Sequence, residues 1–400
     1  GVPIIAKGFG SNVKRKERTL TQKSEAMKSE QRSEEIFKGK TIYLGVDVHR
    51  KSYQVSSLHE GQVLGKSVRI DGHAGALLKW ARNRYKGAEL IFGYEAGFSG
   101  LSLSRHLREA GYECHVLNPA DIPSTNKDRV YKTDKRDSKK IAYALMNPYS
   151  NYNYQIAPWA EQLRQNVRGA LRLNSDISRL QHRIKQNLYY LGLNMPRTAR
   201  GWESWSQASR EQIRQQAQTG GHLAIHLWLD QLEQLLGCKQ KMWQDIDQML
   251  LESPLQCPYE LLQTLKGVGK ILSATLVTEI IDMRRFSSIN KLRSYIGLTP
   301  GETSSGEQVR VGSMTKRGNR ILRWALIQVA RRVMDSDAEI AMRYAQWRKQ
   351  CSHDHKAIVK VANLLLGRIR SMWLKQEAYR SPYSDLSAGR LPSEASSETR

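Results

Sequence analysis

The stretch TIYLGVDV, residues 41–48, is a run of β-branched and aromatic residues that carries an acid, Asp47, near its end. Similar short runs recur along the chain: SYQVSSLH (52–59), QVLGKSVRI (62–70), AELIFGYE (88–95) and YECHVL (112–117). Runs of this length and composition predict strands, and the stretches before and after AELIFGYE have helical character. Three strands followed by alternating helices and strands predict an α/β domain with a mixed sheet.

The segment KTDKRDSKKIAYALM, residues 132–146, adds a helix after the last strand. The resulting order, β-β-β-α-β-α-β-α, resembles that of the ribonuclease-H-like fold. We therefore expect residues 39–158 to form a domain of this class. Residues 1–38 are basic and polar, and we expect a flexible extension there, with a basic arm on nucleic acid as the alternative.

Strand-forming runs are absent from residues 159–253. Apolar residues recur there at three- and four-residue spacing, as in Ile177, Leu180 and Ile184, which predicts long helices joined by the loop MPRTARGWESWSQ (195–207). We expect an antiparallel hairpin or coiled coil that dimerises the chain or separates two working domains. An ordinary helical core is an equal alternative.

The C-terminal region, residues 254–375, is again helical, and a Gly- and Ser-rich stretch at 299–318 interrupts it. This pattern predicts a mainly α domain. Residues 376–400 are Ser-rich and polar, which is typical of a disordered tail.

The balance of charge indicates the kind of partner. The chain has 63 Lys and Arg against 38 Asp and Glu, a formal net charge of +25. A charge of this size indicates a polyanion. Nucleic acid is favoured over a membrane, because no apolar run approaches the roughly 18 residues that a spanning helix needs.

Cysteine usage and the first residues indicate the compartment. The four cysteines lie far apart and form no Cys-x-x-Cys pair, which argues against a zinc site and against a secreted disulfide framework. The first segment has neither the apolar core nor the cleavage site of a secretory signal. We expect a cytoplasmic protein that acts on the chromosome.

Four acids fall at comparable points of the predicted elements. Asp47 and Glu95 end two strands, and Asp134 and Asp137 lie three residues apart on one face of the following helix. Carboxylates that converge repel one another unless a cation neutralises them, so this set predicts a divalent metal site. Mg²⁺ fits best, because the ligands are hard oxygens and no His or Cys set with the spacing typical of softer metals accompanies them. Two such ions about 4 Å apart can activate an attacking oxygen and stabilise a leaving one in phosphoryl transfer. Taken singly, each acid could be a turn, cap or solvated helix residue.

A glycine turn opens the C-terminal region within LLQTLKGVGKILSATLVTEI, residues 261–280. Gly267 and Gly269 lie between two helical patterns and Lys270 follows them, so backbone N–H groups at the start of a helix could hold a phosphate. The pattern is typical of a helix-hairpin-helix element that grips the DNA backbone without reading its sequence. A tight turn between packed helices is the alternative.

A second motif lies downstream in YIGLTPGETSSGEQVRVGSMTKRGNRILRWALIQVA, residues 295–330. Two serines and a glycine are followed by a series of cations: Arg310, Lys316, Arg317, Arg320 and Arg323. A hydroxyl among cations is suited to attacking or contacting a phosphate, because positive groups stabilise the charge of the transition state. In isolation, the pattern is more typical of a phosphate-contacting turn than of a nucleophile.

Together these motifs resemble the insertion-sequence one-hundred-and-ten family of transposases, a group that includes pilin-gene invertases. The likeness covers residues 43–334. The family has a RuvC-like domain with a DEDD tetrad, a coiled coil, and a C-terminal transposase domain with a catalytic serine. GVDVHR carries the first acid, GYEAG the second and KTDKRDSKKIA the last two, and LTPGETSSGEQVRVGSMTKRGNRILR matches the serine motif.

The resemblance implies roles for individual residues. The tetrad would hold Mg²⁺, and Ser305 would attack the DNA backbone to form a covalent phosphoserine link. Ser305 is chosen because the family's serine directly precedes a glycine, as Ser305 precedes Gly306; Ser304 is the alternative. The two domains would complete one composite site across a homodimer, or a tetramer when assembled on DNA.

The resemblance also implies a noncoding bridge RNA that pairs with donor and target DNA. The large positive charge fits, because RNA and DNA would have to be held at once. We expect contacts to the nucleic-acid backbone from four cations of this motif, Arg310, Lys316, Arg317 and Arg320, and a solvated basic helix face is the alternative.

Two competing functions use the same residues differently. In a metal-dependent nuclease or Holliday-junction resolvase, the acids activate water and the serine is not needed. In an architectural protein, the acids are structural and the chain binds DNA without cutting it. The serine in its basic setting favours the recombinase.

Overall fold

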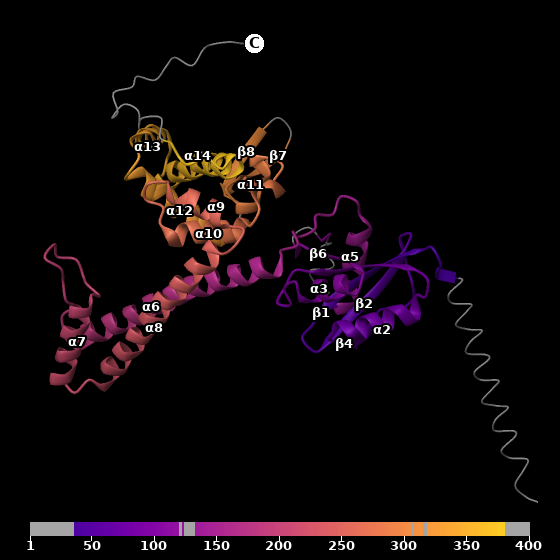
Figure 1. The fold of residues 1–400 in the computed structure, drawn as a ribbon, viewed down its shortest axis with the longest axis horizontal. Helices are drawn as coiled ribbons and strands as arrows, with labels where there is room; N and C mark the ends of the chain where they lie inside the picture. Colours follow the sequence, from indigo (N-terminus) through magenta and orange to yellow (C-terminus); the bar gives the residue numbers. More distant parts are fainter. Residues whose placement is uncertain (1–35, 120–121, 124–132, 306–307, 315–317, 381–400) are drawn as a thin grey trace, which may run out of the picture. The chain divides into compact units, whose positions relative to one another are not determined.

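The computed structural model describes residues 36–119, 122–123, 133–305, 308–314 and 318–380, and for 300–305 and 308–314 it describes the backbone. The chain divides into two compact units, with the boundary between Gln155 and Ile156 (Figure 1). Within the described part of the chain, no helix has both the length and the apolar character needed to cross a membrane.

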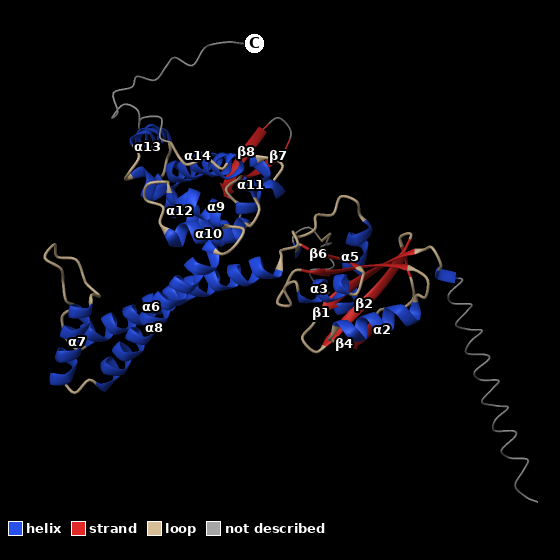
Figure 2. Ribbon diagram, viewed as in Figure 1, coloured by secondary structure: helices blue, strands red, loops and turns tan. Residues whose placement is uncertain are grey.

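A mixed six-stranded sheet forms the centre of the first unit (Figure 2). Its strands are β1 (Thr41–Val48), β2 (Ser52–His59), β3 (Gln62–Val63), β4 (Val68–Asp71), β5 (Glu89–Glu95) and β6 (Glu113–Leu117). The order is β3-β2-β1-β5-β6, and β4 also pairs with β2. Strands β1, β5 and β6 are parallel, whereas β2 is antiparallel to β1. The predicted α/β domain with a mixed sheet is confirmed, except that the third predicted strand is divided into β3 and β4. Gly65, at a positive φ of 77°, lies between the two.

The two faces of the sheet carry different helices. Alternate residues of a strand point to opposite faces. On one face, Leu44 and Val46 of β1 share a core with Leu77 of α2 (Ala74–Arg84) and Leu107 of α3 (Ser102–Glu109). The odd-numbered residues of β1 therefore face the other side, where α5 (Asp134–Met146) lies.

Glycine at one strand position lets α5 approach the sheet closely. A Cβ atom at Gly45 would lie 2.2 Å from the carbonyl oxygen of Ser138 and 2.4 Å from the amide nitrogen of Ala142. The Oγ atoms of Ser138 and Ser56 are 2.8 Å apart, which ties the same turn of α5 to β2. Because Gly45 lies two residues before Asp47, this packing places the first turn of α5 beside the end of β1.

Two long helices begin the second unit: α6 (Pro158–Tyr190) and α8 (Leu223–Leu251). Leu163, near the start of α6, shares a core with Leu250, near the end of α8, so the two helices are antiparallel. Their other ends pack with a helix that the sequence analysis did not predict, α7 (Gln207–Thr219). Its sequence, QASREQIRQQAQT, has too few apolar residues to show a clear period, although Ser206 caps its start. The coiled coil stays a prediction.

The rest of the second unit is mainly helical, as predicted. The elements are α9 (Gln256–Gln263), α10 (Lys270–Ile280), η2 (Met283–Arg285), α11 (Ile289–Ile296), β7 (Pro300–Ser305), β8 (Gln308–Met314), α12 (Arg320–Met334), α13 (Ala338–Gln350) and α14 (Asp354–Lys375). The Gly- and Ser-rich interruption contains the antiparallel pair β7 and β8. The start of α6 and the end of α8 belong to the same hydrophobic core as helices α9 to α14.

The four free cysteines should differ in reactivity. Burial raises the pKa of the Cys114 thiol to about 12, and its side chain lies in the sheet core. Cys238 and Cys257 are exposed. Because the thiolate is the reactive form, we expect iodoacetamide at mildly alkaline pH to label Cys238 and Cys257 quickly and Cys114 only after unfolding. Mass spectrometry of the labelled peptides, with a guanidinium-unfolded control, measures this; rapid native labelling of Cys114 would contradict the burial.

Candidate functional site

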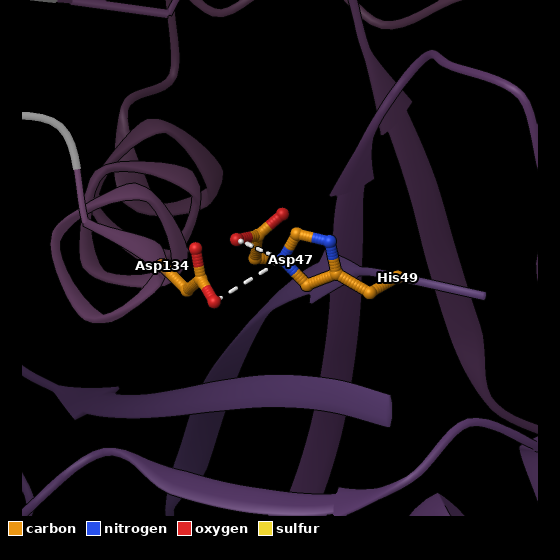
Figure 3. A group of neighbouring side chains, drawn as sticks. All are labelled: Asp47, His49 and Asp134. Atoms are coloured by element: carbon orange, nitrogen blue, oxygen red, sulfur yellow. Dashed lines mark hydrogen bonds and ion pairs between the residues drawn. The ribbon is translucent and has the colours of Figure 1, made fainter. Parts of the chain in front are cut away.

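Two of the four predicted acids converge with a histidine at the end of β1. The Nε2 atom of His49 lies 3.2 Å from a carboxylate oxygen of Asp47 and 3.4 Å from one of Asp134 (Figure 3). The three side chains offer ligand atoms that all lie within 4.8 Å of one another. Two carboxylates and an imidazole at these distances are a donor set that fits a divalent ion.

The surroundings of Asp47 make its charge costly. Burial raises the pKa of Asp47, and the negative charges of Asp134 and Asp137 raise it further, whereas the charge and hydrogen bond of His49 lower it. A carboxylate in this position is stabilised by any cation placed between it and Asp134. The electrostatics therefore agree with the geometry of the cluster.

The other two predicted acids lie close in the fold but outside this group of three. Glu95 ends β5, whose Tyr94 pairs with Val46 of β1, so Glu95 and Asp47 are the next residues of two neighbouring parallel strands. Asp137 lies one turn after the start of α5 and is paired with Lys140, with 3.3 Å between Nζ and Oδ1. The negative charge of Asp137 nevertheless raises the pKa of Asp47.

His49 was not among the predicted ligands, although it lies within 3.4 Å of both Asp47 and Asp134. Asp47 and His49 are two residues apart at a strand end, and a spacing of two is the strand period that places side chains on one face. This Asp-x-His spacing was the available signal. Because a ring nitrogen lies among the carboxylate oxygens, the chemistry of the ligands does not by itself select Mg²⁺.

The predicted serine lies at the end of a strand in the second unit. Ser305 is the last residue of β7 and its Cα partner in β8 is Gln308, and Ser304 is paired with Val309. Arg310 lies in β8 opposite Thr303. Of the other predicted contacts, Arg320 begins α12 and is exposed, while Lys316 and Arg317 lie outside the described residues.

The root of this hairpin is held by backbone contacts. Gly318 has a φ of 101°, and a Cβ there would lie 2.6 Å from the amide nitrogen of Gly297, so the chain before β7 and the chain after β8 touch backbone to backbone. The amide of Asn319 donates to the carbonyl of Tyr295. The Asn319 side chain accepts from the amides of Ile321 and Leu322 and so caps α12.

A buried carboxylate joins the hairpin root to the long helix α6. Glu279 lies in α10 and is fully buried. Its carboxylate oxygens accept hydrogen bonds from the guanidinium of Arg168 at 2.6 and 2.8 Å and from the side-chain nitrogen of Asn319 at 2.7 Å. Burial alone would raise the pKa of Glu279, but the hydrogen bonds from Arg168 and Asn319 and the charges of Arg168 and Arg164 outweigh it and lower that pKa. The guanidinium of Arg164 donates to the carbonyls of Thr278 and Glu279.

The glycine turn lies between α9 and α10. Gly267 has a φ of 86°, and a Cβ there would lie 2.8 Å from the carbonyl oxygen of Arg332, so it is packed against the end of α12. This contact accounts for Gly267 as a packing turn. Gly269 precedes α10, and no heavy atom of the described residues lies within 4 Å of its Cβ position; Lys270 is ion-paired with Asp247. A phosphate contact at Gly269 or Lys270 stays a prediction.

Two family profiles match this chain. One begins in the first unit and continues past residue 155 into the second unit, and the other lies within the second unit. The profile of the DEDD transposases of the IS110 type matches residues 44–191, and that of the transposase IS116/IS110/IS902 family matches residues 259–345. The first range contains all four predicted acids, and the second contains Ser304, Ser305 and the glycine turn.

Individual relatives agree with the profiles. The protein y4rJ of Sinorhizobium fredii (strain NBRC 101917 / NGR234), which is named as a transposase, is 27% identical over 322 residues, 72% of this chain and 79% of its own length. The transposase for insertion sequence element IS1328 of Yersinia enterocolitica is 24% identical over 270 residues, 65% of this chain and 76% of its own. The transposase for insertion sequence element IS1533 of Leptospira borgpetersenii is 29% identical over 165 residues, 40% of this chain and 47% of its own.

Proposed function

Because this chain belongs to the IS110 family of transposases and carries its DEDD, RuvC-like domain, we propose that it cuts and exchanges DNA strands through a covalent phosphoserine link assisted by a metal-bound acidic tetrad. The observation that carries the proposal is the convergence of Asp47 and Asp134 on one point in the domain that the DEDD profile matches. Glu95, on the neighbouring strand end, and Asp137, one turn into α5, complete the tetrad.

The acids and the serine have separate tasks in this proposal. The tetrad would hold Mg²⁺ or another divalent ion, which would supply positive charge to stabilise the phosphate oxygens at the reacting phosphorus. The Ser305 hydroxyl attacks the phosphorus, a serine–phosphorus ester bond forms, and the bond from phosphorus to the leaving DNA oxygen breaks. The serine hydroxyl gives up its proton as the ester forms, and the leaving DNA oxygen takes up a proton and becomes a free hydroxyl. Attack by the hydroxyl of another strand then reverses the step, so strands are exchanged without net hydrolysis.

The partners follow from charge and family. The net charge of +25 supports simultaneous binding of donor and target DNA and of a structured bridge RNA. Arg310, Arg320 and the glycine turn are the proposed contacts to the nucleic-acid backbone, together with Lys316 and Arg317. A homodimer that brings the acids of one copy to the serine of another completes the site.

Replacing Asp47 by Asn tests the role of the acids. This change keeps the shape of the side chain and removes its charge, so we expect strand cleavage to fall by about 100-fold or more, because metal-ion stabilisation is worth several kcal/mol. Nucleic-acid binding, measured by gel shift, should stay within a few-fold of wild type. Chelation of divalent ions with EDTA should stop cleavage by the wild-type protein in the same assay.

Asp71→Asn is the matched control, because Asp71 is an exposed aspartate at the end of β4 in the same unit. It should cleave like wild type. If Asp47→Asn instead lowers the melting temperature and abolishes binding, the acid is structural and the architectural alternative gains support.

A further inference from the structure

The imidazole of His49 lies beside both Asp47 and Asp134. Its Nε2 lies within 3.4 Å of both Asp47 and Asp134, whereas no direct contact joins the two carboxylates among the ion pairs and hydrogen bonds described at this cluster. Figure 3 shows both interactions running to the same ring nitrogen. One nitrogen atom is therefore directed at the position from which a cation would contact both acids.

The backbone directs the ring there. The amide of His49 donates to the carbonyl of Ser52 at 3.0 Å, which closes the turn between β1 and β2. Asp47 lies two residues earlier in β1 on the face that α5 covers, and Asp134 is the first residue of α5. The side chain of His49 is half-exposed, so its ring is accessible to an ion that enters from solvent.

We propose that His49 is a nitrogen ligand of the ion held by Asp47 and Asp134, and that it makes the site prefer Mn²⁺ over Mg²⁺. This inference rests on the proposed function, because it concerns the same acidic centre. Carboxylate and water oxygens suit Mg²⁺, which accepts imidazole poorly, whereas first-row transition ions accept imidazole together with carboxylates. Neutral imidazole is a common metal ligand, and the Nε2 lone pair is the donor that this geometry presents.

The opposite role of His49 makes an opposite prediction. If the ring is only a cationic partner that the metal displaces, its removal leaves two repelling carboxylates, and these bind a metal ion as tightly as before or more tightly. If the ring is a ligand, its removal weakens binding. The sign of the change in affinity therefore separates a ligand from a counter-ion.

The experiment uses the full chain, with Mn²⁺ alone as the probe. Pulsed electron paramagnetic resonance detects the coupling of bound Mn²⁺ to a ligand nitrogen, and titration of free Mn²⁺ gives the dissociation constant. We expect wild type to show nitrogen coupling. His49→Gln should lose the coupling and bind Mn²⁺ about 10-fold or more weakly, since losing a residue that orients or supplies a ligand costs about 10- to 100-fold. The excess of Mg²⁺ needed to displace Mn²⁺ should also fall in this variant.

His59→Gln is the control, because His59 lies in the same unit and its ring is hydrogen-bonded to the carbonyl of Thr41, the first residue of β1, at the opposite end of that strand from Asp47. It should match wild type in every readout. Nitrogen coupling that is absent in wild type, or unchanged or tighter Mn²⁺ binding by His49→Gln, would overturn the inference and leave the acidic centre intact. Mn²⁺ binding that is unaffected by Asp47→Asn would overturn the acidic centre itself, and the inference with it.

Discussion

Replacing Ser305 by Ala is expected to abolish the covalent protein–DNA adduct. In the proposed mechanism the adduct is an ester between the serine oxygen and a DNA phosphate, and alanine has no oxygen with which to form it. The assay combines the purified protein with Mg²⁺, the RNA of its own element and matched DNA, and separates the products on a denaturing gel. Wild type should give a slowly migrating species that contains both protein and DNA, and Ser305→Ala should give none.

Ser304→Ala is the matched control, because it removes the neighbouring hydroxyl in the same strand, β7. It should keep the adduct. Loss of the adduct in Ser304→Ala but not in Ser305→Ala would transfer the nucleophile to Ser304. Cleaved DNA without an adduct in any of the three proteins would support the metal-dependent nuclease, in which water attacks in place of serine.

Replacing Glu279 by Ala is expected to lower the free energy of unfolding of the second unit strongly. The carboxylate is fully buried and is hydrogen-bonded to Arg168 and Asn319. Its removal leaves the partly buried Arg168 without its charge partner, and breaking a buried ion pair in this way costs about 3–5 kcal/mol. Chemical denaturation followed by circular dichroism, restricted to the transition of the second unit, measures the free energy of unfolding.

Glu233→Ala is the control for this change. Glu233 is exposed and ion-paired with Arg210 and Arg214 in the same unit, and exposed pairs contribute about 0–1 kcal/mol. A loss in Glu279→Ala no larger than the loss in Glu233→Ala would show that the buried network contributes little.

The contribution of Glu279 to the free energy of unfolding should also fall as the pH is lowered. Its pKa is lowered in the folded state, so the stabilisation is present above the unfolded pKa of about 4.3 and is lost as pH falls through the lower folded value. The difference in stability between wild type and Glu279→Gln should therefore narrow when the pH is lowered below about 4. An unchanged difference would indicate that the negative charge is not what stabilises the network.

Local patterns were sufficient for most of the elements and for the order of the acids, although they did not predict α7. Strands β1, β5 and β6 were predictable because buried parallel strands are short apolar runs, and α6 and α8 because their apolar residues recur at the helical period. The acids Asp47 and Glu95 were predictable because each ends such a run. These signals lie within one element or at its boundary, where neighbours in sequence are also neighbours in space.

Features that depend on distant residues could not be predicted in this way. The close approach of α5 to Gly45 brings Asp134 to His49, although 85 positions separate their numbers in the sequence. The Arg168–Glu279–Asn319 network likewise joins α6, α10 and the residue before α12. Such contacts are set by how whole elements pack, and a polar residue has the same local signature whether or not a partner from another element reaches it. The core strands and the candidate acids thus follow from the sequence. The contact of His49 with Asp134, and the buried Glu279 at the root of the serine hairpin, follow only from the packing of the elements.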